Sequence, residues 1–237
     1  MSFDNILSSL RSVGNEAAVI NSNLVGTTKT GYKATNISYG GSGSQQLGNN
    51  TQIPDQNLTT SSTSLDFSQG QLVSTGQPTQ FGINGNGFFL LQQIQDVGVT
   101  PPNLITRDGS FKFTNIGATN ILTTNNGLAV LRDNGFGVYN TIKDTDFNTN
   151  NFRPSIVSPS DTSDGLKFSN KGSTVFEFKG TLAAGDGQLV QGSLEASNSE
   201  LAESVAAMSL NSKKFAAMAS QLKVENNNLD TVIGLFK

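Results

Sequence analysis

The chain has 237 residues and a net charge of −3; 35% of its residues are hydrophobic and 14% are charged. A chain of this length can form one large domain or two modest ones around a buried core. It contains no histidine and no cysteine, which excludes histidine-based triads, thiol nucleophiles, Cys/His zinc sites and disulfides. Its 15 lysines and arginines are scattered rather than clustered, so no nucleic-acid partner is expected.

The N-terminal segment has no basic region followed by an apolar core, so we expect no secretory signal peptide. No window approaches 18 uninterrupted apolar residues, so we expect no transmembrane helix and no direct insertion into a membrane. If the protein leaves the cytoplasm, we expect a route that reads no cleaved signal.

Apolar side chains recur three and four residues apart along the first 24 residues. This heptad spacing predicts an α-helix with an apolar stripe along one face. Glycines and threonines in residues 26–31 end the pattern. The residues that define this first seam are Ile6, Leu10, Val13, Ile20 and Leu24.

Residues 39–64 are polar, rich in glycine and poorly periodic, which is typical of a linker or an extended arm. Turn signals then recur every eight to ten residues, with apolar alternation between them, and predict short antiparallel strands in a meander or small barrel. Residues 173–180 predict one further strand. The turn signals are Asn84-Gly85, Asp108-Gly109, Gly117, Asn126-Gly127 and Asn134-Gly135.

The stretch QFGINGNGFFLLQQ, residues 80–93, places three glycines in front of an apolar run. Its G-x-x-G-x-G spacing lacks the lysine of a P-loop, and it differs from the G-x-G-x-x-G of dinucleotide-binding folds. The stretch therefore predicts a β-turn that leads into a buried strand.

A second and longer apolar seam occupies the C-terminal end. Ser197 and Glu200 have capping-box spacing before it, and a helix over about residues 199–236 would be on the order of 57 Å long. Such a sustained 3.5-residue repeat indicates coiled-coil packing. Asn226 lies on the seam, either as a tolerated polar residue or as one that fixes the register. The seam residues are Leu201, Val205, Met208, Phe215, Leu222, Asn226, Leu229 and Ile233.

These elements predict an α+β fold, in which a discontinuous coiled-coil-like domain of N- and C-terminal helices carries an inserted antiparallel all-β domain. The expected parts are residues 1–30 with 197–237 as a helical assembly domain, 31–75 as an extended linker or arm, and 76–196 as the β-rich domain. Two helices alone leave much of their apolar faces uncovered. We therefore expect the two ends to be an assembly device that uses neighbouring subunits.

No combination of side chains predicts catalysis. The segment beginning at Asp144 imitates an EF-hand, but Thr149 stands where glycine is required and Ser155 where a bidentate glutamate is required. We expect no enzyme, no cofactor and no bound metal. An enzyme based on carboxylates or on Ser and Lys is the alternative that the composition leaves open.

Three segments, NLVGTTKTGYK, FSQGQLVSTGQPTQFGINGNGFF and VQGSLEASNSEL, carry motifs in a recognisable order. They resemble the axial proteins of the bacterial flagellum, the rod and hook subunits. TRDGSFKF continues the resemblance with Ile105 in place of the usual tyrosine, and the first motif departs from the family at Val25 and Gly26. The matching residues are Asn23, Leu24, Gly31, Tyr32, Lys33, Phe67, Gln69, Gly70, Gly85, Gly87, Phe88, Phe89, Gly192, Leu194, Glu195, Ser197 and Asn198.

The resemblance implies a helical homopolymer, a hollow tube that transmits torque and passes exported subunits, with terminal helices inside and the β domain outside. It implies adjoining rod or hook proteins and the flagellar type III export apparatus as partners, and a place in the basal-body rod or in the hook at the cell surface. The length is most like that of a distal rod protein. The alternatives are a hook protein without its outer domain and, in a different class, a β-domain binding or adhesion module oligomerised by a coiled coil.

Overall fold

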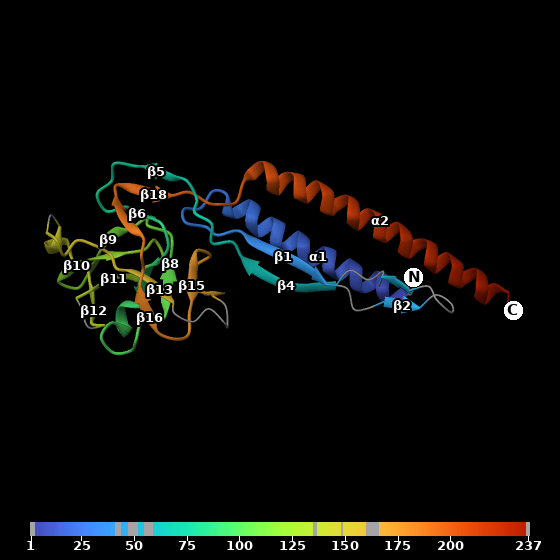
Figure 1. Cartoon of the computed structure of the whole chain (residues 1–237), viewed down its shortest axis with the longest axis horizontal. Coiled ribbons are helices and arrows are strands. Elements are labelled where there is room, and N and C mark those ends of the chain that lie inside the picture. Colours follow the sequence, from blue (N-terminus) through green and yellow to red (C-terminus); the bar gives the residue numbers. More distant parts are fainter. Residues whose placement is uncertain are drawn as a thin grey trace. The chain divides into compact units, whose positions relative to one another are not determined.

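The structure is a computed structural model that describes residues 3–40, 44–46, 52–54, 59–134, 137–147, 149–159 and 166–235. Within these ranges the chain is α+β, with a helix near each end of the sequence and a large antiparallel β region between them along the chain (Figure 1), as the sequence predicts. The chain divides into two compact units. Unit 1 comprises Met1–Val25, Ala34–Asp66 and Ser199–Lys237, and unit 2 comprises Gly26–Lys33 and Phe67–Asn198. The boundaries drawn from the sequence stay a prediction.

Unit 1 contains the two long helices, α1 (Phe3–Gly26) and α2 (Leu201–Gly234). The residue before α2 is Glu200, whose side chain makes no capping hydrogen bond, so the capping box predicted at Ser197 is wrong. The physical reason is the backbone of Glu200, which is extended (φ −95°, ψ 135°) where a capping box that starts at Ser197 would need it to be the third residue of the helix.

Two strands of unit 1, β1 (Thr35–Gly40) and β4 (Thr59–Leu65), pair antiparallel with a register shift between Ser38 and Tyr39. The short strands β2 (Ser44–Gln46) and β3 (Gln52–Pro54) also pair. The described part of the segment expected to be a linker or arm therefore forms paired strands. Its threonine-rich sequence explains this, because β-branched side chains favour extended backbone even without apolar alternation.

Unit 2 is built on one sheet of ten strands. Its main path runs through β14 (Lys167–Phe168), β15 (Val175–Glu177), β8 (Leu104–Thr106), β7 (Phe88–Gln92), β11 (Ala129–Asp133), β10 (Thr119–Thr123) and β9 (Lys112–Ile116). Joined to this path are β12 (Tyr139–Thr141), β13 (Ile156–Pro159) and β16 (Leu182–Ala184). Two separate antiparallel pairs are β17 (Gln188–Gln191) with β6 (Phe81–Asn84), and β18 (Ser193–Glu195) with β5 (Leu72–Ser74). Two short 3-10 helices are η1 (Ile94–Asp96) and η2 (Asp144–Asp146).

The glycine-rich stretch lies at the centre of unit 2. Gly85 and Gly87 have positive φ, and a side chain at Gly87 would clash with Ile156, so both positions require glycine. All five residues of the following strand, β7, are buried. The prediction of a turn leading into a buried strand is confirmed. The surrounding core comprises Phe81, Ile83, Phe89, Leu91, Leu104, Phe111, Leu122, Leu128, Val130, Ile142, Phe152 and Val175.

Candidate functional site

The most deeply buried charges of unit 2 form a group of three side chains, Lys33, Arg107 and Glu195, which we call the buried triad. The Lys33 ammonium lies 2.7 Å from one carboxylate oxygen of Glu195, and the Arg107 guanidinium lies 3.2 Å from the other. The side chains of Lys33 and Glu195 are fully buried and that of Arg107 is 4% exposed. One carboxylate therefore pairs with two buried cations contributed by distant segments.

Backbone groups of the motif segments complete the triad. Lys33 Nζ donates to the Ser68 carbonyl (2.7 Å), and Arg107 Nη2 donates to the Gly85 carbonyl (2.7 Å). The Gly70 amide donates to Glu195 Oε1 (3.0 Å). Hydrogen bonds to charged groups contribute about 1.5–3 kcal/mol each. The triad thus joins segments that are up to 162 residues apart in the sequence.

Arg107 is held between opposing electrostatic effects. Burial lowers the pKa of Arg107 from its ordinary value, while the charge and hydrogen bond of Glu195 act in the opposite direction. Its guanidinium carbon also lies 5.4 Å from the centre of the Phe88 ring, within the range of a cation–π contact. The positive charge of Arg107 in this buried position is therefore stabilised by Glu195 and by the Phe88 ring.

Two glycines of the motifs allow the backbone to approach the triad. Gly31 has φ +63° and lies against the backbone of Arg107 and Asp108, so a side chain there would clash. A Cβ at Gly70 would overlap the carbonyl oxygen of Ala196, directly after the glutamate of the triad. Gly31 and Gly70 are thus explained by close backbone contacts beside the buried charges.

We expect Gly70→Ala to lower the free energy of unfolding by about 1–3 kcal/mol, because the added methyl group overpacks this contact. Gly14→Ala is the matched control, since Gly14 lies within α1 with no atom within 4 Å of an added Cβ. Alanine at an exposed helical position stabilises by about 0.5–1 kcal/mol. Urea denaturation of both variants should show shifts of opposite sign, and a shift of the same sign would contradict the close contact.

The other motif residues lie around this centre or within unit 1. Gln69 bridges the Ile83 carbonyl (3.1 Å) and the Gly85 amide (2.9 Å) in unit 2. In unit 1 the Asn23 side chain makes two hydrogen bonds of 2.9 Å with the backbone of Thr35. Of the rest, the buried ones are Tyr32, Phe88 and Phe89, the half-buried ones are Leu24, Gly192, Leu194, Ser197 and Asn198, and Phe67 is exposed.

Arg107 is the one residue of the triad that is not among the functional residues predicted from the sequence. The T-R-x-G pattern around it was available as a signal, since TRDG continues the resemblance. An isolated arginine in a sequence normally indicates a solvated surface. Only the fold shows that Arg107 shares the carboxylate of Glu195 with Lys33.

The apolar seam of α2 is largely exposed, whereas that of α1 is mostly buried. Ile6, Val13 and Ile20 are at most 7% exposed, and Leu10 and Leu24 are half-buried. On α2, Leu222 is half-buried and Asn226 is exposed. The remaining seam residues, which we call the α2 stripe, are between 37% and 59% exposed; they are Leu201, Val205, Met208, Phe215, Leu229 and Ile233.

The α2 surface that contacts α1 lies directly beside the α2 stripe, because Asn211 and Phe215 are only about 40° apart around the helix. Its buried residues are polar, Ser204 and Asn211. Asn211 Nδ2 donates to the Val13 carbonyl (3.0 Å) and to the Glu16 carboxylate (2.9 Å), which also binds Lys214 Nζ (2.9 Å). The described hydrogen bonds and ion pairs between the helices are therefore made beside the α2 stripe, and the stripe stays available.

The Glu16 carboxylate predicts a pH dependence for unit 1. Burial alone would raise its pKa, but hydrogen bonds from Lys214 and Asn211 and the charge of Lys214 hold the pKa of Glu16 below its ordinary value. A lowered pKa stabilises the folded state above the unfolded pKa, roughly 4.3, and this stabilisation is lost as the pH falls through the folded pKa. We expect the stability advantage of the wild type over Glu16→Gln to be constant near neutral pH and to shrink below about pH 4. Thermal unfolding followed by circular dichroism across this pH range checks it, and an advantage that grows on acidification would contradict it.

The carboxylates of the EF-hand-like segment are used by the backbone and by a neighbouring strand. Asp146 Oδ2 accepts from the Lys143 amide (2.9 Å), and Asp144 Oδ2 accepts from Asn120 Nδ2 (2.6 Å). The fifth position of the motif, residue 148, lies outside the described residues. Within the described ranges, the acidic side chains nowhere form a group of three or more that could hold a metal ion.

No helix in the described part of the chain has the length and apolarity needed to cross a membrane. A scan against protein-family models finds no match to this chain, and a search of curated proteins finds none.

Proposed function

We propose that the chain is a structural subunit of the bacterial flagellar rod–hook axial structure, which polymerises helically into a hollow tube that transmits torque and passes exported subunits. The observation that carries this proposal is the α2 stripe. It presents six large apolar side chains along one long helix, each between 37% and 59% exposed. Exposed apolar side chains that gather along one helix are a feature of interaction sites.

The lengths of the helices add to this argument. α2 has 34 residues and α1 has 24, and the two run antiparallel from the contact of Ser199 Oγ with the Asn23 carbonyl (3.1 Å). With Ser199 opposite Asn23, about 22 Å of α2 extends beyond the first residue of α1 at 1.5 Å per residue. Leu229 and Ile233 lie on this extension. The part of the stripe on this extension can therefore form a coiled coil only with a helix from another subunit. The coiled-coil packing predicted from the sequence is thus proposed to form between subunits.

The buried triad supports the proposed family. Its members and their backbone partners come from the same segments whose motifs resemble rod and hook subunits, so the motifs have a common physical reason. Within this family we propose a distal rod protein, with a hook protein that lacks the outer domain as the alternative. Adjoining rod or hook proteins and the type III export apparatus are the partners in this proposal, with the rod or the hook as its location.

The proposal makes no use of catalysis, cofactors or metal ions. The alternative from a different class, a β-domain binding or adhesion module, uses the same helices for a small closed oligomer. The two differ in symmetry, because heterologous contacts that do not close grow into open helical polymers, whereas a bundle has a fixed number of subunits.

Sedimentation velocity over a wide concentration series tests this difference. We expect species that grow without limit as the concentration rises, or growth on added rod or hook fragments as templates. A single oligomer of fixed mass, independent of concentration and of template, would contradict the tube and favour the binding module.

A further inference from the structure

Unit 2 contains a hollow of about 400 Å³ that neither the buried triad nor the α2 stripe uses. It is formed by the turn at residues 28–30, the start of the loop after β8, the turn between β10 and β11, and residues 173–175 before and within β15. All of these segments belong to unit 2. The volume lies within the range of about 300–1,000 Å³ that is usual for small-molecule sites.

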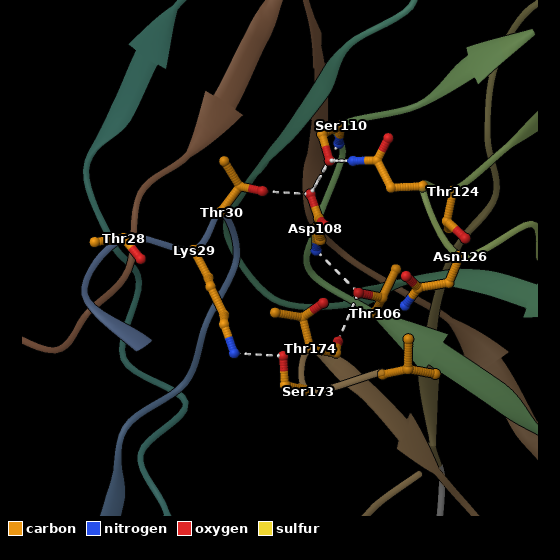
Figure 2. A pocket seen from close by; sticks show the side chains of 12 residues that line it. Thr28, Lys29, Thr30, Thr106, Asp108, Ser110, Thr124, Asn126, Ser173 and Thr174 are labelled. Carbon is orange, nitrogen blue, oxygen red and sulfur yellow. Dashed lines mark hydrogen bonds between the residues drawn. The ribbon is translucent and has the colours of Figure 1, made fainter. Parts of the chain in front are cut away.

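Hydrogen bonds between the walls hold the hollow open in a defined shape (Figure 2). From one turn, Lys29 Nζ reaches Ser173 Oγ (2.8 Å) while Thr30 Oγ1 reaches Asp108 Oδ1 (2.5 Å) on another wall. Asp108 Oδ1 also accepts from the Ser110 hydroxyl (2.7 Å), as Figure 2 shows. These polar contacts fix the walls of the hollow. They do not use all the polar groups of its lining.

Several of these groups retain unused hydrogen-bonding capacity. Within the described part of the chain, Asp108 Oδ2 and the side-chain oxygens of Asn125 and Asn126 accept no hydrogen bond, and Lys29 has no ion-pair partner. Each of these residues lines the hollow. The hollow thus combines open acceptors, one ammonium group with donors to spare, and a lining of hydroxyls.

The lining selects the class of ligand. One carboxylate alone does not hold a metal ion, and Asp108 opposes a phosphate or other polyanion. Val175 is the single apolar side chain of the lining, and no aromatic ring accompanies it, so the lining does not suit a nucleobase or an apolar molecule. Groups that both donate and accept suit a ligand whose own groups do the same.

We propose that this hollow is a binding site for a polyhydroxylated ligand of the saccharide class. Asp108 and the two asparagines accept hydrogen bonds from ligand hydroxyls, and Lys29 donates to a ring or hydroxyl oxygen. Because Lys29 is positively charged, the site should prefer a sugar that carries one carboxylate. The site would give the subunit a contact with glycan-type material beside its role in assembly. It stands independently of the tube, because each of its walls belongs to unit 2.

The test is an amide-resonance NMR titration of the full chain in dilute solution, with glucose, N-acetylglucosamine, glucuronate, cellobiose and, as a separate anion probe, sodium phosphate. The expected result is saturable shifts of the amides of residues 28–30, 108–110, 124–127 and 173–175 with at least one sugar. No shift with any sugar, or shifts of these amides with phosphate alone, would overturn the proposal.

Variants then assign the binding groups. Asn125→Ala combined with Asn126→Ala should weaken binding of the best sugar at least tenfold, whereas Asn86→Ala, an exposed asparagine on another turn, should leave it unchanged. Lys29→Met should reduce the preference for glucuronate over glucose. Unchanged affinity in the double variant would overturn the assignment. As a folding control, the amide resonances of the β region in each variant should match those of the wild type away from the substituted positions.

Discussion

Glu195→Gln is expected to lower the free energy of unfolding of unit 2 by about 3–5 kcal/mol, the usual effect of breaking a buried ion pair from one side. The substitution keeps the shape of the side chain but removes the one charge that faces both Lys33 and Arg107. Both buried cations then lose the carboxylate that they share. Because unit 2 is of moderate size, its melting temperature should fall by roughly 10 °C.

Calorimetry gives the melting temperature, and hydrogen exchange of the β7 amides reports unit 2 alone. Glu203→Gln is the matched control, since Glu203 is exposed on α2, and its effect should stay within about 0.5 kcal/mol. Lys33→Met should be less damaging than Glu195→Gln, because it leaves the carboxylate paired with Arg107. Equal effects of Glu195→Gln and Glu203→Gln would show that the triad contributes little to stability.

The combined variant Phe215→Asp and Leu229→Asp is expected to abolish polymerisation while the single chain stays folded. Both side chains are 50% exposed, so the monomer loses little buried surface. In a polymer each would be covered by another subunit, and a buried carboxylate without a partner is strongly unfavourable. Sedimentation should show a monomer at concentrations where the wild type assembles, with the circular dichroism spectrum of the folded wild type.

The matched control is Ala217→Asp with Ser220→Asp, which adds the same two charges to exposed positions outside the stripe. This control should keep the ability to polymerise. If both variants assemble, the stripe is not an interface. If both fail to assemble, added charge rather than the position on the helix is responsible.

Local patterns were sufficient for the terminal helices and for the central strand. Heptad spacing places α1 and α2, and the glycines before Phe88 and Phe89 predict the turn into β7, because both signals depend on neighbouring residues. The polar sequence around residues 35–65 gives no such alternation, and its pairing as β1 and β4 depends on contacts between residues that are 19 to 30 positions apart. Propensity alone does not determine such pairings.

The buried triad and the direction of the α2 stripe could not be predicted in the same way. Lys33, Arg107 and Glu195 come together only through the tertiary fold of unit 2, and nothing in the sequence near each residue marks it as buried. The heptad pattern of α2 identifies an apolar face but not its partner. In the single chain, Asn211 and Lys214 bind Glu16 on the side toward α1, and the apolar side chains of the stripe beside them remain exposed.

The central claim is that the α2 stripe becomes covered when the chain assembles, and a single-cysteine labelling experiment tests it most directly. The chain contains no cysteine, so Met208→Cys on the stripe and Ser220→Cys outside it each introduce one thiol. In dilute monomer both should react readily with a maleimide. In the sedimented assembly the thiol at position 208 should be protected at least tenfold relative to the thiol at position 220. Equal labelling of the two positions in the assembly would contradict the claim.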